Sequence, residues 1–221
     1  MAQITYKDIK KSKEINAYID KGNTTLGVLG YTDHSAVHAV KVSAMAGKIL
    51  ERLDYDAHTV ELAKIAGYMH DIGNCVNRMD HPHSGALMAH QILRGLDMDY
   101  EDIAVIINAI GMHDEKSGGA VDAVSAALIL ADKTDVRRDR VRNRNKAAFD
   151  KHDRVNYAVI SSSLDIQKDK KTLKLELELD EGICSMMDYF EIFLQRMLMC
   201  RRAASVLGMT FKLNANGNKI C

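Results

Sequence analysis

Apolar residues recur at helical spacing through the first two thirds of the chain. The pattern predicts helices over residues 6–20, 33–53, 57–71, 82–93, 100–111 and 121–136, and a Gly- and Thr-rich loop over residues 21–32. Pro82 stands at an early helical position, where proline is well tolerated. We therefore expect residues 1–150 to be almost wholly helical.

The pattern changes after Asp153. Residues 172–179 alternate strictly between polar and apolar side chains, which is typical of a half-buried strand. The expected elements are a strand over 155–166, a polar turn over 168–171, a strand over 172–179, a helix from about 183 to 207, and a short strand over 209–214. The chain is thus predicted to be mainly α, with a helical domain over residues 1–150 and a small α+β appendage over residues 151–221.

The composition narrows the possible partners. The 221 residues include 30 acidic and 30 basic side chains, so the formal net charge is zero. General binders of nucleic-acid polymers or of membrane surfaces usually carry a net basic field, so neither partner is expected. No apolar stretch approaches the length of a membrane span, and no signal pattern opens the chain, so a cytoplasmic location is expected.

Eight of the nine histidines fall between His34 and His113. One isolated histidine would be interpreted as a surface residue or as a satisfied core residue, but this concentration favours a shared site. His34 and His38 are one helical turn apart, which predicts that they share a helix face. His81 precedes Pro82 at a predicted helix start, and His113 follows an apolar helix.

Two carboxylates accompany these imidazoles. Asp71 follows His70 at the end of an apolar helix, and Asp132 closes another apolar helix. A buried carboxylate is costly without a cationic partner, and a divalent metal ion is the strongest such partner. Gly73 is predicted to end the first of these helices as a left-handed cap.

The donor types indicate which metal is expected. Imidazoles and carboxylates without thiolates suit Mn, Fe, Co, Ni or Zn better than Ca or Mg. There are more candidate ligands than one tetrahedral ion can use, so the sequence favours two ions. The candidate ligands are His34, His38, His70, Asp71, His81, His113 and Asp132.

The order His38, His70-Asp71, Asp132 resembles the H…HD…D signature of the HD-domain superfamily of metal-dependent phosphohydrolases. The resemblance covers roughly residues 30–145 and implies an HD-domain helical bundle. The segment His-Pro-His-Ser-Gly-Ala at 81–86 resembles the HPxxGA string of HD-GYP phosphodiesterases and a related string in symmetrical diadenosine-tetraphosphate hydrolases.

In those binuclear groups, the histidine matching His81 and one in the position of His113 hold a second ion. His34 occupies the place of an additional acidic ligand in HD-GYP proteins. The residues after His113 differ from the HHExxDGxGYP string of cyclic-di-GMP phosphodiesterases, so that substrate is not expected.

The resemblance implies a hydrolase in which Asp71 shares two ions that activate a water molecule. The expected substrate is a nucleotide or another small phosphorylated metabolite. Many of these enzymes have lysine where Asn74 stands, and Arg78, one turn later, is expected to replace that phosphate contact. We assign Asp71, Arg78 and Arg137 as catalytic residues.

An arginine-rich segment follows Asp132. Its members are Arg137, Arg138, Arg140, Arg142 and Arg144. Arginine grips phosphate oxygens through two parallel hydrogen bonds, and Arg137 or Arg138 is the better placed candidate. The alternative, favoured for most of the segment, is a solvated face paired with Asp135 and Asp139.

Two other functions stay open at this stage. A few HD relatives use a di-iron site as oxygenases, and this ligand set permits that chemistry. A non-catalytic HD regulatory or binding module is the third hypothesis, although such modules usually lose ligands that this chain retains. The appendage has no counterpart in the common HD core and is expected to support a homodimer or to cover the active site. Its long helix is rich in Met and aromatic residues, which favours core or dimer packing.

Overall fold

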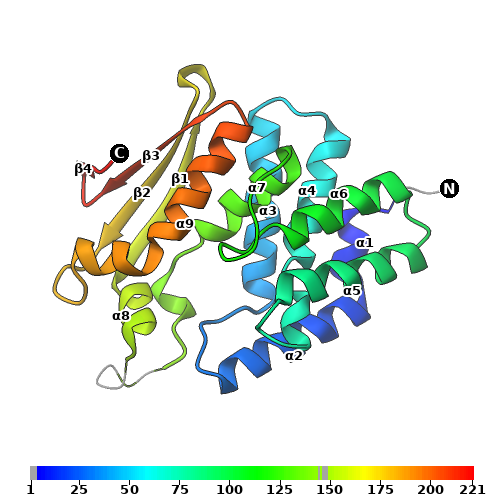
Figure 1. The fold of residues 1–221 in the computed structure, drawn as a ribbon, viewed down its shortest axis with the longest axis horizontal. Helices are drawn as coiled ribbons and strands as arrows, with labels where there is room; N and C mark the ends of the chain where they lie inside the picture. The colour runs from blue at the N-terminus through cyan, green and yellow to red at the C-terminus, as the bar shows by residue number, and fades with distance from the viewer. Residues whose placement is uncertain (1–3, 144, 146–148) are drawn as a thin grey trace.

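The computed structural model describes residues 4–143, 145 and 149–221, and shows a helical bundle beside a small sheet (Figure 1). This arrangement confirms the mainly α fold with a C-terminal α+β appendage. The bundle comprises α1 (Tyr6–Lys11), α2 (Lys13–Val28), α3 (Ala36–Arg52), α4 (Ala57–Met69), the short 3-10 helix η1 (Ile72–Cys75), α5 (His81–Gly95), α6 (Tyr100–Gly111) and α7 (Ala123–Lys133). The remaining elements are η2 (Arg138–Arg140), α8 (Lys151–Ala158), β1 (Val159–Gln167), η4 (Lys168–Lys170), β2 (Thr172–Leu179), α9 (Met186–Val206), β3 (Thr210–Ala215) and β4 (Asn218–Lys219).

The N-terminal helices differ from the prediction in two ways. The expected helix over residues 6–20 is interrupted at Ser12, whose side chain caps α2. The expected loop over residues 21–32 is wrong, because α2 continues to Val28. Gly22 does not break the helix; it lets α2 approach η1, since a Cβ there would lie 3.1 Å from the backbone nitrogen of Cys75.

The segment before α3 also departs from the prediction. Ser35 caps α3, so His34 precedes the helix and does not share a helix face with His38. The loop nevertheless brings the two rings together, with centroids 5.6 Å apart. Several hydrogen bonds hold this loop; among them, the Asn23 side chain accepts from the backbone N–H of His34, and Arg140 donates to the carbonyl oxygen of Asp33.

Gly73 is not the left-handed helix cap that the sequence suggests. Helix α4 ends at Met69, and Gly73 lies inside η1 with an ordinary backbone conformation. A Cβ at Gly73 would overlap with the carbonyl oxygen of His81 and would lie 2.5 Å from the backbone nitrogen of Gly85. Glycine is therefore needed so that η1 can pack directly against the start of α5.

Helix α7 forms the centre of the bundle. All residues from Val124 to Ala131 are buried, which is the pattern of a helix surrounded by protein. Helices α3, α4 and α6 pack against it, and α3 and α4 also approach closely, because a Cβ at Gly67 would lie 2.8 Å from the Cα of Ser43. The bundle therefore fixes the ends of α4 and α7 relative to each other.

The C-terminal sheet has the strand order β1-β2-β3-β4. Strands β1 and β2 form the predicted antiparallel hairpin, β3 pairs parallel to β2, and β4 pairs antiparallel to β3. The four leucines of β2 are buried, as the alternation predicts. Helix α9 lies along the sheet and packs against both β3 and α7 (Figure 1).

The first predicted strand begins later than expected. Residues 155–158 belong to α8, whose N-terminus is capped by the Asp150 side chain, which accepts from the backbone N–H of Asp153. The division of the chain at residue 150 stays a prediction. In the described part of the chain, no helix combines the length and the apolar character that crossing a membrane requires.

Candidate metal centre

Five imidazoles and two carboxylates from distant parts of the chain converge inside the bundle. They come from the loop before α3, from α3, from the end of α4, from the start of α5, from the residues after α6, and from α7. The residues are His34, His38, His70, Asp71, His81, His113 and Asp132. The structure thus brings together every ligand candidate that the sequence suggested.

The two carboxylate oxygens of Asp71 face two different groups of imidazoles. Oδ2 lies 3.2 Å from Nε2 of His70, 3.9 Å from that of His38 and 4.0 Å from that of His34. Oδ1 lies 3.4 Å from Nε2 of His81 and 3.8 Å from that of His113. One carboxylate therefore joins two sets of nitrogen donors.

Asp132 completes the first set. Its Oδ1 lies 3.3 Å from Nε2 of His38 and 3.8 Å from Nε2 of His70. His81 and His113 form the second set, with their Nε2 atoms 3.2 Å apart. Within the described residues, three groups bring their donor atoms within 4.8 Å of one another. The groups are His38 with His70 and Asp71, His70 with His113 and Asp132, and Asp71 with His81 and His113.

Each imidazole is oriented through its other nitrogen. Nδ1 of His38 lies 2.8 Å from Oδ2 of Asp135, and the other four Nδ1 atoms lie against backbone carbonyl oxygens. These oxygens belong to Thr32 for His34, Gly67 for His70, Arg78 for His81 and Ile110 for His113, at 2.8, 2.9, 3.0 and 2.6 Å. Such acceptors fix the proton on Nδ1, so the lone pair of each Nε2 is directed into the cluster.

The donor set fits a divalent transition metal. Nε2 of His38 and Nε2 of His70 are buried and have no hydrogen-bond partner among the described residues. Nε2 of His81 and Nε2 of His113 meet at 3.2 Å, where two lone pairs would repel each other without a cation between or beside them. Buried nitrogens without partners are costly, and metal ligation satisfies them.

The ionisation of the centre also suits a metal. Burial raises the pKa of Asp71, but His70 and His34 outweigh burial and hold that pKa well below its ordinary value. Burial likewise raises the pKa of Asp132, which Lys133 and the neighbouring histidines lower well below the ordinary range. Burial lowers the pKa of His113 and of His34. The carboxylates are therefore charged and these imidazoles neutral near pH 7, as ligands must be.

Sequence reasoning missed the residues that support the ligands. Asp135 accepts from Nδ1 of His38, and Lys133 contacts Oδ2 of Asp132 at 2.7 Å. Glu115 contacts Lys133 at 2.9 Å. The spacing of Asp135 after Asp132 could have indicated this role, because a metal-binding histidine usually donates its second N–H to a carboxylate or carbonyl.

The candidate phosphate contacts differ in their surroundings. Nη1 of Arg78 lies 3.2 Å from Nε2 of His81, so Arg78 reaches the edge of the cluster. Arg137 forms ion pairs with Asp135 and Asp139, as the alternative interpretation expected. Its role as a catalytic residue stays a prediction. Arg144 lies outside the described residues.

Arg140 is the most deeply placed arginine of that segment among the described residues. Its side chain is buried, and it donates to the carbonyl oxygens of Asp33 and Asp135. These bonds tie the loop that carries His34 to the segment that follows α7. Arg140 therefore stabilises the approach of two parts of the metal centre.

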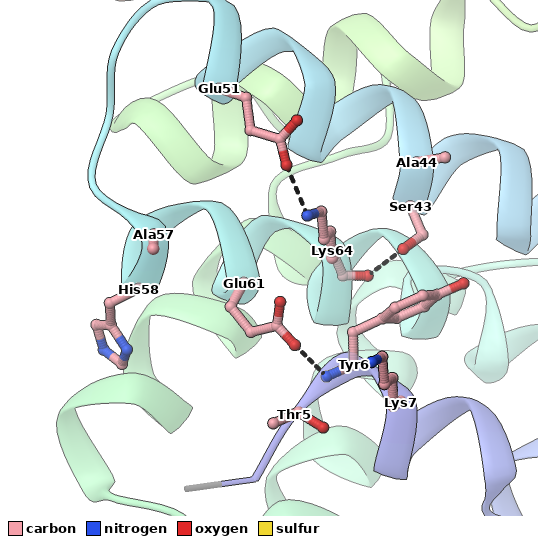
Figure 2. Close-up of a pocket in the computed structure, with 10 residues that line it drawn as sticks. All are labelled: Thr5, Tyr6, Lys7, Ser43, Ala44, Glu51, Ala57, His58, Glu61 and Lys64. Atoms are coloured by element: carbon pink, nitrogen blue, oxygen red, sulfur yellow. Dashed lines mark hydrogen bonds and ion pairs between the residues drawn. The ribbon is translucent and has the colours of Figure 1, made fainter.

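A cavity of about 810 Å³ lies elsewhere, between α1, α3 and α4 (Figure 2). None of the candidate ligands lines it. Several of its polar groups bond to one another: Lys64 pairs with Glu51 at 2.7 Å, and Glu61 accepts from the backbone N–H of Tyr6 (Figure 2). We therefore assign the functional site to the histidine cluster.

Comparison with known proteins places this cluster in a family. The HD-domain family model matches residues 36–158. An uncharacterised protein of Methanocaldococcus jannaschii, MJ1020, is 26% identical over 162 residues, which is 63% of this chain and 62% of that protein. Ribonuclease Y of Chlorobium luteolum is 34% identical over 104 residues, covering 46% of this chain and 18% of that protein, and ribonuclease Y of Enterococcus faecalis is 35% identical over 98 residues, covering 44% and 17%.

The chain thus spans less than two thirds of the length of these relatives. A predicted HD superfamily hydrolase from an uncultured Thermotogales bacterium, known from a crystal structure, gives a TM-score of 0.44 at 24% identity, over 57% of this chain and 68% of that one. The family match includes His38, His70, Asp71 and Asp132 and covers more than half of the chain. The chain belongs to the HD-domain family.

Proposed function

We propose that this protein is a metal-dependent phosphohydrolase that holds two divalent transition-metal ions and cleaves a phosphoester of a nucleotide or another small phosphorylated metabolite. The observation that supports this proposal best is the position of Asp71, whose two oxygens face separate groups of imidazoles. Ions bound there would supply an activated water nucleophile and a counter-charge for the phosphoryl oxygens.

The residues of the chain prepare the site for this reaction. Asp71 and Asp132 stay ionised near neutral pH, because their neighbours keep each pKa well below its ordinary value. The carbonyl and carboxylate acceptors at the five Nδ1 atoms hold each ring in one orientation, so little reorganisation is needed. Burial of His38, His70, His81 and His113 keeps competing water away from the ligands.

Arg78 is the cation that we propose for phosphate binding. It is partly buried, and its Nη1 contacts both the Asn74 side chain and His81. A guanidinium at this distance can donate to a phosphate oxygen of a substrate beside the second group of imidazoles. Phosphoryl transfer depends mainly on positioning and electrostatics, so loss of this cation should lower the rate.

The proposal is tested with metal-loaded protein. Mn²⁺, Fe²⁺, Co²⁺, Ni²⁺ or Zn²⁺ is added to metal-free protein, and release of phosphate or nucleotide is followed with a panel of generic phosphoesters, nucleotides and a short RNA. Asp71→Asn is the inactive control. Hydrolysis of small phosphoesters by the wild type but not by Asp71→Asn supports the proposal. The absence of hydrolysis with every metal contradicts it.

The short RNA is included in the panel because some relatives are named ribonuclease Y, so it tests whether the substrate is RNA. Cleavage of RNA alone would move the substrate class to nucleic-acid polymers, against the balanced charge of the chain. Oxygen uptake by anaerobically iron-loaded protein would favour the di-iron oxygenase instead. Metal binding without either activity would favour the regulatory module.

A further inference from the structure

A continuous set of ion pairs links the C-terminal helix α9 to the metal centre. Nη2 of Arg196 lies 3.4 Å from Oε1 of Glu115, and Oε2 of Glu115 lies 2.9 Å from Nζ of Lys133. The same Nζ lies 2.7 Å from Oδ2 of Asp132. Arg196 therefore reaches a candidate metal ligand through two intermediate side chains.

The two oxygens of the Asp132 carboxylate make different contacts. Oδ1 faces the imidazoles of His38 and His70, while Oδ2 is held by Lys133. A carboxylate fixed by an ammonium on one oxygen cannot rotate freely, so the other oxygen keeps its direction toward the cluster. Lys133 thus sets the orientation of Asp132.

Glu115 competes for the same ammonium. The Lys133 side chain is only 6% exposed, and it is shared between Asp132 and Glu115. Arg196 gives Glu115 a second cationic partner, because Oε1 of Glu115 faces Arg196 while Oε2 faces Lys133. Without Arg196, the whole charge of Glu115 would act on Lys133 and draw it away from Asp132.

Packing alone does not explain why Arg196 occupies this position, because the position leaves a buried donor of its side chain unsatisfied. Its guanidinium lies 4.3 Å from the centre of the Phe193 ring, and α9 packs against α7. Its Nε is nevertheless buried and has no hydrogen-bond partner among the described residues. Leaving a buried N–H donor unsatisfied is unfavourable for folding. The interaction that Arg196 gains in return is the ion pair with Glu115.

We propose that Arg196 is a positioning residue which, through Glu115 and Lys133, holds Asp132 in the orientation needed for metal binding. Through Arg196, the C-terminal appendage then contributes to the metal centre. This inference rests on the proposed function only in taking Asp132 as a metal ligand.

The test measures Mn²⁺ affinity of the full chain by isothermal titration calorimetry. Arg196→Met keeps the aliphatic packing over Phe193 and removes the ion pair. We expect it to weaken Mn²⁺ binding about tenfold, the lower end of the effect of losing a residue that orients a ligand. Arg196→Lys should restore most of the affinity, and Arg202→Ala, an exposed arginine of the same helix, should leave it unchanged.

The direction of the change separates positioning from a simple charge effect. Removal of a nearby cation favours binding of another cation, so a purely electrostatic role predicts tighter Mn²⁺ binding by Arg196→Met. Equal or tighter binding than in Arg202→Ala would overturn the inference. In a Glu115→Gln background, Arg196→Met should cause no further weakening, because Arg196 acts through Glu115; an additive loss would also overturn it.

Folding and function are controlled separately. Circular dichroism and thermal melting establish that each variant is folded, and Arg196→Gln replaces Arg196→Met if that variant is not. Wild-type protein that binds Mn²⁺ but hydrolyses no phosphoester would contradict the proposed function and leave this affinity comparison fully informative. Wild-type affinity in a folded Arg196→Met or Arg196→Gln variant would contradict the inference, whatever the activity.

Discussion

Nε2 of His81 lies 3.4 Å from Oδ1 of Asp71, the oxygen on the opposite side of the carboxylate from the one that faces His70. This relationship assigns His81 to the second group of imidazoles alone. We expect His81→Ala to lose one of two bound ions and to keep the other, because His38, His70, Asp71 and Asp132 remain.

Elemental analysis of protein purified without a metal-affinity tag measures this directly, with His83→Ala as the exposed neighbour for comparison. About two ions per chain in the wild type and about one in His81→Ala is the expected result. One ion in both proteins would reduce the centre to a mononuclear site.

Asp135 is expected to matter for metal affinity although it is not a ligand candidate. It holds Nδ1 of His38, and the loss of such a partner typically weakens metal binding by roughly 10- to 100-fold. Asp135→Asn should show this loss in a calorimetric titration with Mn²⁺. Asp139→Asn, which alters only an exposed partner of Arg137, should retain wild-type affinity.

Gly73→Ala tests the close contact between η1 and α5. The new Cβ would overlap with the carbonyl oxygen of His81, so we expect a loss of about 1–3 kcal/mol in the free energy of unfolding and weaker binding of the second ion. Denaturant titration measures the stability. Gly95→Ala, at the end of α5 with open space around it, should be neutral or slightly stabilising.

The metal-free protein should lose stability as the pH falls below about 6.5. Burial holds the pKa values of His34, His81 and His113 below the ordinary histidine value of 6.5, so the unfolded chain takes up protons that the folded chain does not. Their contribution to stability is present above pH 6.5 and is lost as the pH falls through their folded-state values. His70 acts in the opposite direction, because Asp71 outweighs burial and raises its pKa.

Three histidines stabilise the folded state less as the pH falls, and only His70 acts in the opposite direction. The melting temperature of metal-free protein should therefore decrease when the pH is lowered from 8 to 5. His113→Gln should flatten this dependence, whereas His152→Gln, on the surface, should not. A melting temperature that rises toward pH 5 would contradict the prediction.

The sequence singled out residues that the structure brings together, because the residue types are distinctive and the apolar helices around them are regular; their role as ligands stays a prediction. It failed where packing decided the conformation. Gly22 and Gly73 were interpreted as loop and cap residues, but both are glycines because two backbones approach closely. Nothing in the local pattern reveals such an approach, since the second backbone is distant in the sequence.

The supporting residues were hidden for a similar reason. Glu115 and Arg196 are 81 positions apart, and in the sequence neither can be distinguished from an ordinary charged surface residue. Their connection becomes visible only when α9 is packed against α7. Asp135, in contrast, lies three residues after Asp132 and could have been recognised from spacing.

Four of the five imidazoles in the cluster are anchored by main-chain carbonyl oxygens, and only His38 depends on another side chain. Every amino acid offers the same carbonyl, so mutations at Thr32, Arg78 or Ile110 that preserve the local backbone leave this anchoring intact, whereas Gly67 is also fixed by its close approach to Ser43. The side chains around the centre can therefore change, and with them the choice of substrate, without altering how these four nitrogen donors are anchored.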